Sequence, residues 1–294
     1  MIQIAIVSGK GGTGKTTLSA SLALLFEREN LIMVDCDVDA PNLHLVLSPE
    51  VKETHEYIGG KKAVIYEDSC IMCGACQNVC RFDAIYTEES GVYCVDKYAC
   101  EGCGACVIAC PVDAIELKNE RSGDYFLSVS GKTGTYMVHA LLDPGEETSG
   151  GLIAEVRKLA IEKSKEEKKE ILVIDGAPGI GCPASSSITG VTYVLIVTEP
   201  TSSGLHDLKR IVELTRQFRR KFGVVINKYD INKEKCKEIE EWCSKEGIEI
   251  MGKIPYDPDV VKANVYGKAV VEYSQGPASK AILEIFESIR KRVK

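Results

Sequence analysis

A glycine-rich segment directly after the first apolar run most constrains the fold of this chain. The run Ile2–Val7 is β-branched and continuous, as a buried parallel strand is, and an amphipathic stretch follows the segment. The segment consists of Gly9, Lys10, Gly11, Gly12, Thr13, Gly14, Lys15 and Thr16. A strand, a glycine loop and a helix in this order predict a phosphate-binding loop. Its backbone N–H groups and Lys15 would contact phosphates, and the Thr16 hydroxyl would ligate Mg²⁺.

Strand-like runs alternate with amphipathic stretches along the rest of the chain. The further runs that read as strands are Leu31–Asp35, Ile171–Asp175, Val194–Thr198 and Val224–Asn227. The stretches that read as helices are Thr16–Arg28, Leu152–Lys168, Leu205–Lys221, Lys233–Glu246 and Lys280–Arg292. This alternation predicts an α/β fold with a doubly wound, mostly parallel sheet.

Two cysteine runs interrupt the alternation. The first contains Cys70, Cys73, Cys76 and Cys80, and the second contains Cys100, Cys103, Cys106 and Cys110. Thiolates this closely spaced suit a soft metal better than disulfides. Zinc is the alternative, but each run offers three close cysteines and a fourth one turn later, which favours iron–sulfur clusters. The runs sit in an internal repeat, so we expect an inserted α+β domain at residues 61–120 and a nucleotide domain at residues 1–60 and 121–294.

Charge and hydropathy exclude several classes of function. The net charge of −7 argues against a nucleic-acid surface, which needs a basic stripe. No apolar run approaches the ~20 residues of a membrane span, so we expect no stable membrane insertion, and without a leader before Ile2–Val7 we expect a cytoplasmic protein. Residues 61–120 contain five basic and ten acidic side chains, which either steer a basic partner or only keep the insert soluble.

The loop resembles the deviant Walker A motif of the MinD/Mrp family of ATPases, to which the nitrogenase iron protein also belongs. The resemblance is carried by the letters SGKGGTGKTT, which end at Thr17 and include the second lysine, Lys10. It implies binding of ATP or ADP with Mg²⁺, slow hydrolysis, and dimerisation around ATP, in which Lys10, at the open mouth of the loop, reaches across to the phosphates of the facing subunit. It also implies that Asp37 lies near the attacking water and the metal, and that Asp175 holds a metal-bound water.

Two further segments resemble the adenine-binding parts of that family. Asn227 and Lys228 follow a strand, as the family's adenine-recognition asparagine does. Pro255, Tyr256 and Asp257 resemble the loop that flanks the adenine. The resemblance covers most of the chain outside the insert.

The insert resembles bacterial two-cluster ferredoxins, in which the fourth cysteine of each run ligates the other cluster. This resemblance implies two [4Fe–4S] clusters. One would be held by Cys70, Cys73, Cys76 and Cys110, and the other by Cys100, Cys103, Cys106 and Cys80. Arg81 stands where the pattern expects a proline, so a positive charge would lie near the second cluster. We expect Cys94 to be a buried thiol and not a ligand.

Two roles are open for Cys182. It lies at the same offset from Asp175 as a cluster cysteine of the nitrogenase iron protein, so it is a candidate ligand of an extra cluster shared between subunits. The alternative is a thiol packed at the start of a helix. Cys36, Cys236 and Cys243 are expected to be small buried side chains.

The leading functional hypothesis is an ATPase that dimerises on ATP and gates electron transfer through two clusters to a redox partner. The first alternative is an iron–sulfur carrier that hands a cluster to an apo-acceptor protein. The second is a positioning or scaffold ATPase that senses redox state. The partner in the dimer is either a second copy or a related ATPase, and the pattern identifies neither the electron donor nor the acceptor.

Overall fold

The chain divides into two compact units. The structure, a computed structural model, describes residues 1–26, 30–38, 41–146 and 150–292. The first unit comprises Met1–His55, Tyr125–Leu141 and Thr148–Lys294, and we call it the sheet unit. The second comprises Glu56–Asp124 and Leu142–Glu147 and contains both cysteine runs; we call it the cysteine unit. The cysteine unit is thus wider than residues 61–120 at both ends and adds a short later segment.

A nine-stranded sheet organises the sheet unit, in the order β11-β10-β9-β1-β8-β2-β7-β6-β3. Neighbouring strands from β11 to β7 are all parallel. The strands are β1 (Ile2–Ser8), β2 (Leu31–Asp35), β3 (Pro49–Ile65), β6 (Ile115–Ser130), β7 (Tyr136–Leu142), β8 (Ile171–Pro178), β9 (Tyr193–Thr198), β10 (Lys221–Asn227) and β11 (Ile250–Ile254). The doubly wound, mostly parallel α/β fold is therefore confirmed. The strands β3 and β6, which continue into the cysteine unit, were not predicted.

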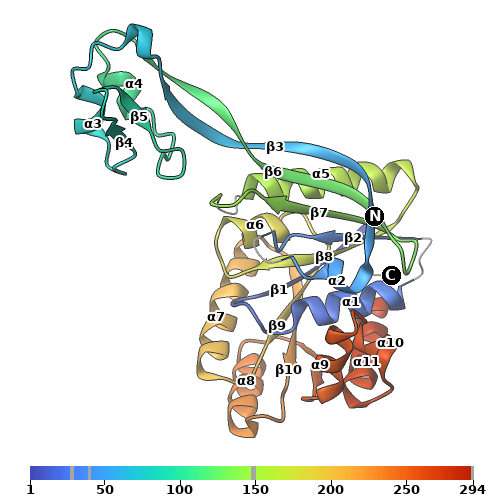
Figure 1. The fold of residues 1–294 in the computed structure, drawn as a ribbon. Helices are drawn as coiled ribbons and strands as arrows, with labels where there is room; N and C mark the ends of the chain where they lie inside the picture. Colours follow the sequence, from blue (N-terminus) through green and yellow to red (C-terminus); the bar gives the residue numbers. More distant parts are fainter. Residues whose placement is uncertain (27–29, 39–40, 147–149, 293–294) are drawn as a thin grey trace. The chain divides into compact units, whose positions relative to one another are not determined.

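Helices cover both faces of the sheet (Figure 1). The helices of this unit are α1 (Lys15–Leu25), α2 (Leu43–Leu47), α5 (Gly150–Glu166), α6 (Cys182–Ile188), α7 (Ser202–Gln217), α8 (Lys233–Lys245), α9 (Pro258–Val265), α10 (Val270–Tyr273) and α11 (Pro277–Arg292). The end of the predicted helix Thr16–Arg28 falls at residues 27–28, outside the described residues. The predicted helix Leu205–Lys221 ends at Gln217, because Arg219 adopts a left-handed φ of 53° and Lys221 begins β10.

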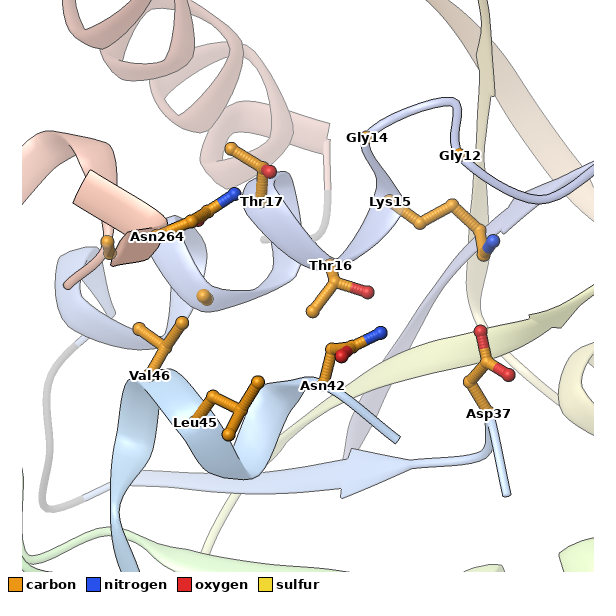
Figure 2. A pocket seen from close by; sticks show the side chains of 12 residues that line it. Gly12, Gly14, Lys15, Thr16, Thr17, Asp37, Asn42, Leu45, Val46 and Asn264 are labelled. Carbon is orange, nitrogen blue, oxygen red and sulfur yellow. The ribbon is translucent and has the colours of Figure 1, made fainter. Parts of the chain in front are cut away.

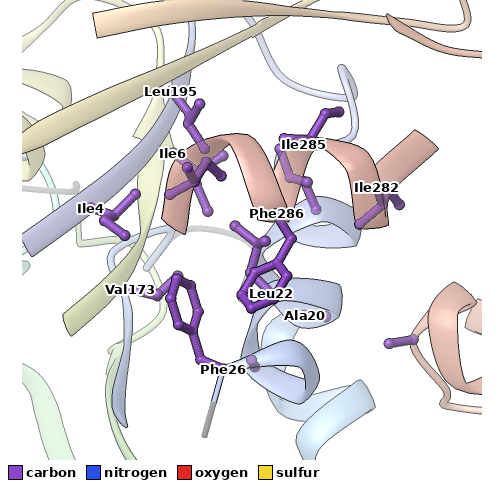
Figure 3. Close-up of a cluster of buried hydrophobic side chains, with 14 of the residues drawn as sticks. Ile4, Ile6, Ala20, Leu22, Phe26, Val173, Leu195, Ile282, Ile285 and Phe286 are labelled. Carbon is purple, nitrogen blue, oxygen red and sulfur yellow. The ribbon is translucent and has the colours of Figure 1, made fainter. Parts of the chain in front are cut away.

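The hydrophobic core on one face joins β1 to α1 and α11 (Figure 3). Phe26, which directly follows α1, meets Phe286 of α11 edge to face, with ring centroids 4.9 Å apart. The apolar stripe of α11, Ile282, Ile285, Phe286 and Ile289, is buried in this core. The stripe is therefore used for packing. None of the helices described in the structure has the length and apolar character that a bilayer crossing requires.

The cysteine unit is built as a repeat around a very small core. Helix α3 (Ala75–Val79) and helix α4 (Ala105–Ala109) each start after a left-handed glycine and end before a cysteine. Strands β4 (Ile85–Thr87) and β5 (Tyr93–Val95) form an antiparallel pair, and the 3₁₀ turn η2 (Glu67–Ser69) precedes Cys70. The buried core residues are Ala63, Cys76, Ala84, Ile85, Cys100, Cys106 and Ile115. A core this small rarely stabilises a unit of such length without disulfides or a metal.

Truncation of Phe286 to alanine is expected to lower the free energy of unfolding by about 3–5 kcal/mol, because it removes a buried ring and leaves a cavity. Urea denaturation followed by circular dichroism measures the loss. Leu283 lies on the same helix with 44% of its surface exposed, so Leu283→Ala should change stability by no more than about 0.5 kcal/mol. Equal losses in the two variants would contradict the packing of α11 described above.

Candidate functional site

The N-terminus of α1 is left open by its local sequence. Gly14 precedes the helix with a φ of 96°, no side chain caps the first turn, and that turn contains no acidic residue. The amide of Asn227 donates a 2.8 Å hydrogen bond to the Thr13 carbonyl, and a Cβ atom on Gly14 would lie 2.2 Å from the Asn227 Nδ2 atom. The free N–H groups of this turn, together with the helix dipole, make an anion site.

A cleft of about 400 Å³ lies at this helix end. It is lined by Gly12, Gly14, Lys15, Thr16, Thr17, Ala20, Asp37, Asn42, Leu45, Val46, Asn264 and Ala269. The side chains of Lys15, Thr16 and Asp37 converge on one part of it (Figure 2). Only 4% of the surface of Lys15 is exposed. The cleft thus combines a buried cation, a hydroxyl and a carboxylate beside the anion site.

Gly9 and Gly11, at the start of the loop, do not line this cleft. A Cβ atom on Gly9 would lie 2.4 Å from the backbone oxygen of Asp207, so this glycine allows the loop to pack on α7. A Cβ atom on Gly11 would meet nothing within 4 Å. In this structure Gly9 therefore serves the packing of the loop on α7.

Two buried carboxylates lie beside the cleft. Asp35 and Asp175 are directly opposite each other on β2 and β8. Burial raises the pKa of Asp175 to about 6, although hydrogen bonding from Thr16 and the charge of Lys15 oppose the rise. Burial and the neighbouring Asp175 also raise the pKa of Asp35. Among the described residues, neither Asp35 Oδ2 nor Asp175 Oδ2 has a hydrogen-bond partner.

These orphaned oxygens fit a bound cation. A buried carboxylate is costly unless it is paired or ligates a metal, and hard oxygen donors suit Mg²⁺. The Thr16 hydroxyl is hydrogen-bonded to Asp175, and Asp37 donates its backbone N–H to Asp35 Oδ1 at 3.0 Å. The donor set of hydroxyl and carboxylate groups therefore fits Mg²⁺. The sequence interpretation named Asp37 and Asp175 but missed Asp35.

Lys10 is held by its own chain in this structure. Its Nζ atom lies 2.7 Å from Glu199 Oε1 and 3.0 Å from the Ser203 hydroxyl. Glu199 Oε2 also lies 3.4 Å from the Nζ atom of Lys228. Burial raises the pKa of Glu199, but the two lysines outweigh it and the net pKa is lowered. The sequence did not reveal this contact of Lys10 with Glu199, and the expected reach of Lys10 to the nucleotide of a facing subunit stays a prediction.

A second cavity, of about 60 Å³, adjoins the loop. Gly14 and Thr17 line it, and so do the five residues expected at the adenine, namely Asn227, Lys228, Pro255, Tyr256 and Asp257. Two of them have structural contacts. The Asp257 carboxylate accepts hydrogen bonds from the backbone of Asp259 and Ala278, and the Asn227 amide supports the phosphate-binding loop.

Each cysteine run contributes to two cavities in the cysteine unit. One, of about 10 Å³, has Cys70, Cys73, Cys76 and Cys110 in its lining. The other, of about 20 Å³, has Cys80, Cys100, Cys103 and Cys106. Three cysteines of each cavity come from one run and the fourth comes from the other run. The structure therefore brings together the two sets of four that the resemblance to ferredoxins implies.

Thiol groups line both cavities, and all thirteen cysteines of the chain are free. No group of three or more His, Cys, Asp or Glu side chains in the described part of the chain is arranged to hold a metal ion. Burial raises the pKa of the Cys76 and Cys106 thiols, a cost that bound iron would offset by holding the thiolates.

The remaining cysteines differ in exposure. Cys36, Cys236 and Cys243 are buried, as expected. Cys94 is only half-buried and donates to Glu88 Oε1 at 3.4 Å. Cys182 begins α6 with an exposed thiol, so the reading of a packed thiol at this position is wrong.

Comparison with known proteins gives the family. Residues 4–270 match the model of the CobQ/CobB/MinD/ParA nucleotide binding domain. An uncharacterized protein of Methanocaldococcus jannaschii is 38% identical, over 99% of this chain and 97% of that protein. The iron-sulfur cluster carrier protein of Pyrococcus abyssi is 22% identical over 99% of this chain and 86% of its own length.

Solved structures share the fold. The septum site-determining protein MinD of Pyrococcus horikoshii, in complex with Mg-ADP, has a TM-score of 0.60 and 20% identity over 99% of this chain and 96% of that one. The family match covers the phosphate-binding loop, the cleft and most of the sheet. The chain belongs to the CobQ/CobB/MinD/ParA family of nucleotide-binding domains.

Proposed function

We propose that this protein is an ATPase that couples ATP-driven dimerisation to electron transfer through two [4Fe–4S] clusters. The observation that carries the proposal is the pairing of two kinds of site in one chain. One is the open helix end beside Lys15 and buried carboxylates. The other is the pair of cavities, each lined by four cysteines.

Each part of the nucleotide site has a proposed role. Lys15 and the N–H groups of the loop bind the β- and γ-phosphates. Bound Mg²⁺, held by Thr16 with Asp37 and Asp175, would neutralise phosphate charge. Asp37 orients the attacking water from its half-buried position at the cleft. Tyr256 and Pro255 contact the adenine in the second cavity.

The eight cysteines of the two cavities are the proposed cluster ligands. A [4Fe–4S] cluster supplies reversible transfer of single electrons. The chain's own contribution is to hold the thiolates and to exclude water from the small core that Cys76, Cys100 and Cys106 help to form. Cys182, whose thiol is exposed, stays a predicted ligand only.

Contacts within the sheet unit support coupling between the nucleotide and the insert. Leu45 and Val46 of α2 line the nucleotide cleft. The next residue, Leu47, accepts a 2.7 Å hydrogen bond from the Ser130 hydroxyl at the end of β6. The carbonyl of Ser48, directly before β3, accepts from the N–H of Gly131. A shift of α2 on binding of the γ-phosphate would therefore act on both strands that lead into the cysteine unit.

A second function, delivery of clusters to apo-acceptor proteins, is favoured by the likeness to relatives named as iron-sulfur cluster carriers. Incubation of the iron-loaded protein with an apo-ferredoxin distinguishes the two. A carrier loses iron to the acceptor in stoichiometric amounts, whereas an electron-transfer ATPase keeps it.

Lys10→Ala is expected to bind ATP but to lose ATP-dependent dimerisation, with kcat lower by about 10³-fold, because Lys10 is proposed to act across the interface as an arginine finger does. In the ATP-bound dimer its Nζ atom would leave Glu199 for the partner's phosphates. Sedimentation with ATP and phosphate release measure the two effects. Lys158→Ala, which removes an exposed lysine paired with Glu155, is the control and should behave as the wild type. Normal turnover and dimerisation of Lys10→Ala would refute the dimer model.

Cys110→Ser is expected to reduce iron from about eight to about four atoms per chain when the protein is prepared without oxygen. The lost cluster should be the one that Cys70, Cys73 and Cys76 hold, because Cys110 lines their cavity. Cys94→Ser is the matched control, since Cys94 lies in the same unit but lines neither cavity.

Iron analysis and electron paramagnetic resonance of the two variants measure this outcome. Full iron content in Cys110→Ser would overturn the crossed assignment of ligands. Zinc as the main metal in the wild type would overturn the electron-transfer function itself.

A further inference from the structure

The two cysteine cavities are alike in their ligands but different in what surrounds them. We call the cavity with Cys70, Cys73, Cys76 and Cys110 the open cavity, and the one with Cys80, Cys100, Cys103 and Cys106 the covered cavity. Cys100 is buried, whereas its repeat counterpart Cys70 is only partly so. The first cysteines of the two repeats therefore differ in how far they are exposed to solvent.

Strand β3 packs against the covered cavity. The Nζ atom of Lys62 donates to the Cys100 carbonyl at 2.9 Å, and the Ala63 N–H lies 3.5 Å from the Cys100 sulfur. A Cβ atom on Gly102 would lie 2.0 Å from the Lys61 carbonyl oxygen. There is therefore no room for a side chain at position 102, and this side of the covered cavity is closed to a partner protein.

The open cavity has apolar side chains at the matching positions. Where the second run has Glu101 and Gly102, the first run has Ile71 and Met72. Of these, Ile71 is 59% exposed and Met72 is 53% exposed. Ile71 and Val112 line the open cavity, whereas Met72 lies beside it in the chain between Ile71 and Cys73; Val112 is 39% exposed. We call Ile71, Met72 and Val112 the apolar rim.

Met72 adopts a backbone conformation that is unfavourable for a residue with a side chain. Its φ is 55°, in the left-handed region, and its counterpart Gly102 has a φ of 63°. Glycine adopts this conformation without strain, whereas methionine does so at a cost. The side chain is half exposed, so burial in the fold does not offset the cost. Strained residues of this kind cluster at functional sites.

Acidic side chains surround the apolar rim in the sequence. Glu67 and Asp68 of η2 come just before Cys70, and Asp113 follows Val112; all three are exposed. An apolar centre with a charged margin is the usual make-up of a protein interface, and the sign of the margin selects the charge of the partner. The partner that fits is therefore a basic protein.

We propose that the apolar rim of the open cavity is the docking face for a basic one-electron-transfer protein. This inference rests on the proposed function, because it requires a cluster in the open cavity. One electron passes between that site and the partner's redox centre, so that one is oxidised and the other reduced, and no bond is formed or broken. The covered cavity then holds the inner of the two electron sites.

Cytochrome c, a small basic haem protein, is a suitable probe. Its dissociation constant for the iron-loaded protein is measured by calorimetry without oxygen, at low and at moderate salt. Met72→Gly installs the residue of the other repeat and removes strain, so iron content should be unchanged. Affinity should fall by about tenfold, because an apolar contact is lost. Salt should weaken all complexes but leave the ratio between variant and wild type in place.

The matched control is Ile108→Asn. Ile108 is 89% exposed in the same unit but lines neither cavity, and its repeat counterpart is Asn78. This variant should bind cytochrome c within about twofold of the wild type. Ile71→Ser, at a position without a left-handed φ, is a second test of the apolar rim and should lose affinity as Met72→Gly does.

Three results would overturn the proposal. The first is that Met72→Gly and Ile71→Ser bind cytochrome c with the affinity of the wild type. The second is that Ile108→Asn loses as much affinity for cytochrome c as the two variants of the apolar rim do. The third is self-association of the wild type, seen by sedimentation without cytochrome c and abolished in Met72→Gly, which would assign the apolar rim to a second copy of this chain. Iron missing from the wild type would instead refute the proposed function.

Discussion

The structure of the nucleotide cleft depends on two carboxylates that are buried side by side, one at the carboxyl end of β2 and the other opposite it on β8. Asp35 and Asp175 face each other in register, and each keeps one oxygen without a partner in the described structure. Such a pair is unfavourable unless cations neutralise it. Lys15 and the open N-terminus of α1 supply positive potential at the same edge of the sheet. A cation bound beside these two oxygens would therefore stabilise the pair.

The cysteine unit also depends on groups other than apolar side chains for its stability. Its core is small, and cysteines form a large part of it. Helices α3 and α4 hold the cysteines around two small cavities. The proposed clusters would supply cohesion that apolar burial in this unit does not.

The sequence revealed the parts of these sites that local patterns encode. The loop from Gly9 to Thr16 and the spacing of the cysteines are contiguous signals, and the structure brings the residues they name to common cavities. Glu199 escaped detection because its contact with Lys10 joins distant segments. The long strand β3 was not predicted because most of its length is exposed, and β6 was not predicted because its buried and exposed residues do not alternate regularly. The left-handed Met72 is visible only from the backbone.

The central claim is that nucleotide binding changes the electron-transfer properties of the clusters. The direct test is to measure the reduction potentials of the iron-loaded protein with and without ATP and Mg²⁺, in the wild type and in Lys15→Ala. Removal of Lys15, which is buried in the nucleotide cleft, should prevent ATP binding without loss of iron. The account predicts that ATP shifts at least one potential of the wild type by about 59 mV or more, a tenfold coupling for one electron, and shifts neither in Lys15→Ala. Potentials that stay the same while the wild type binds and hydrolyses ATP would contradict it.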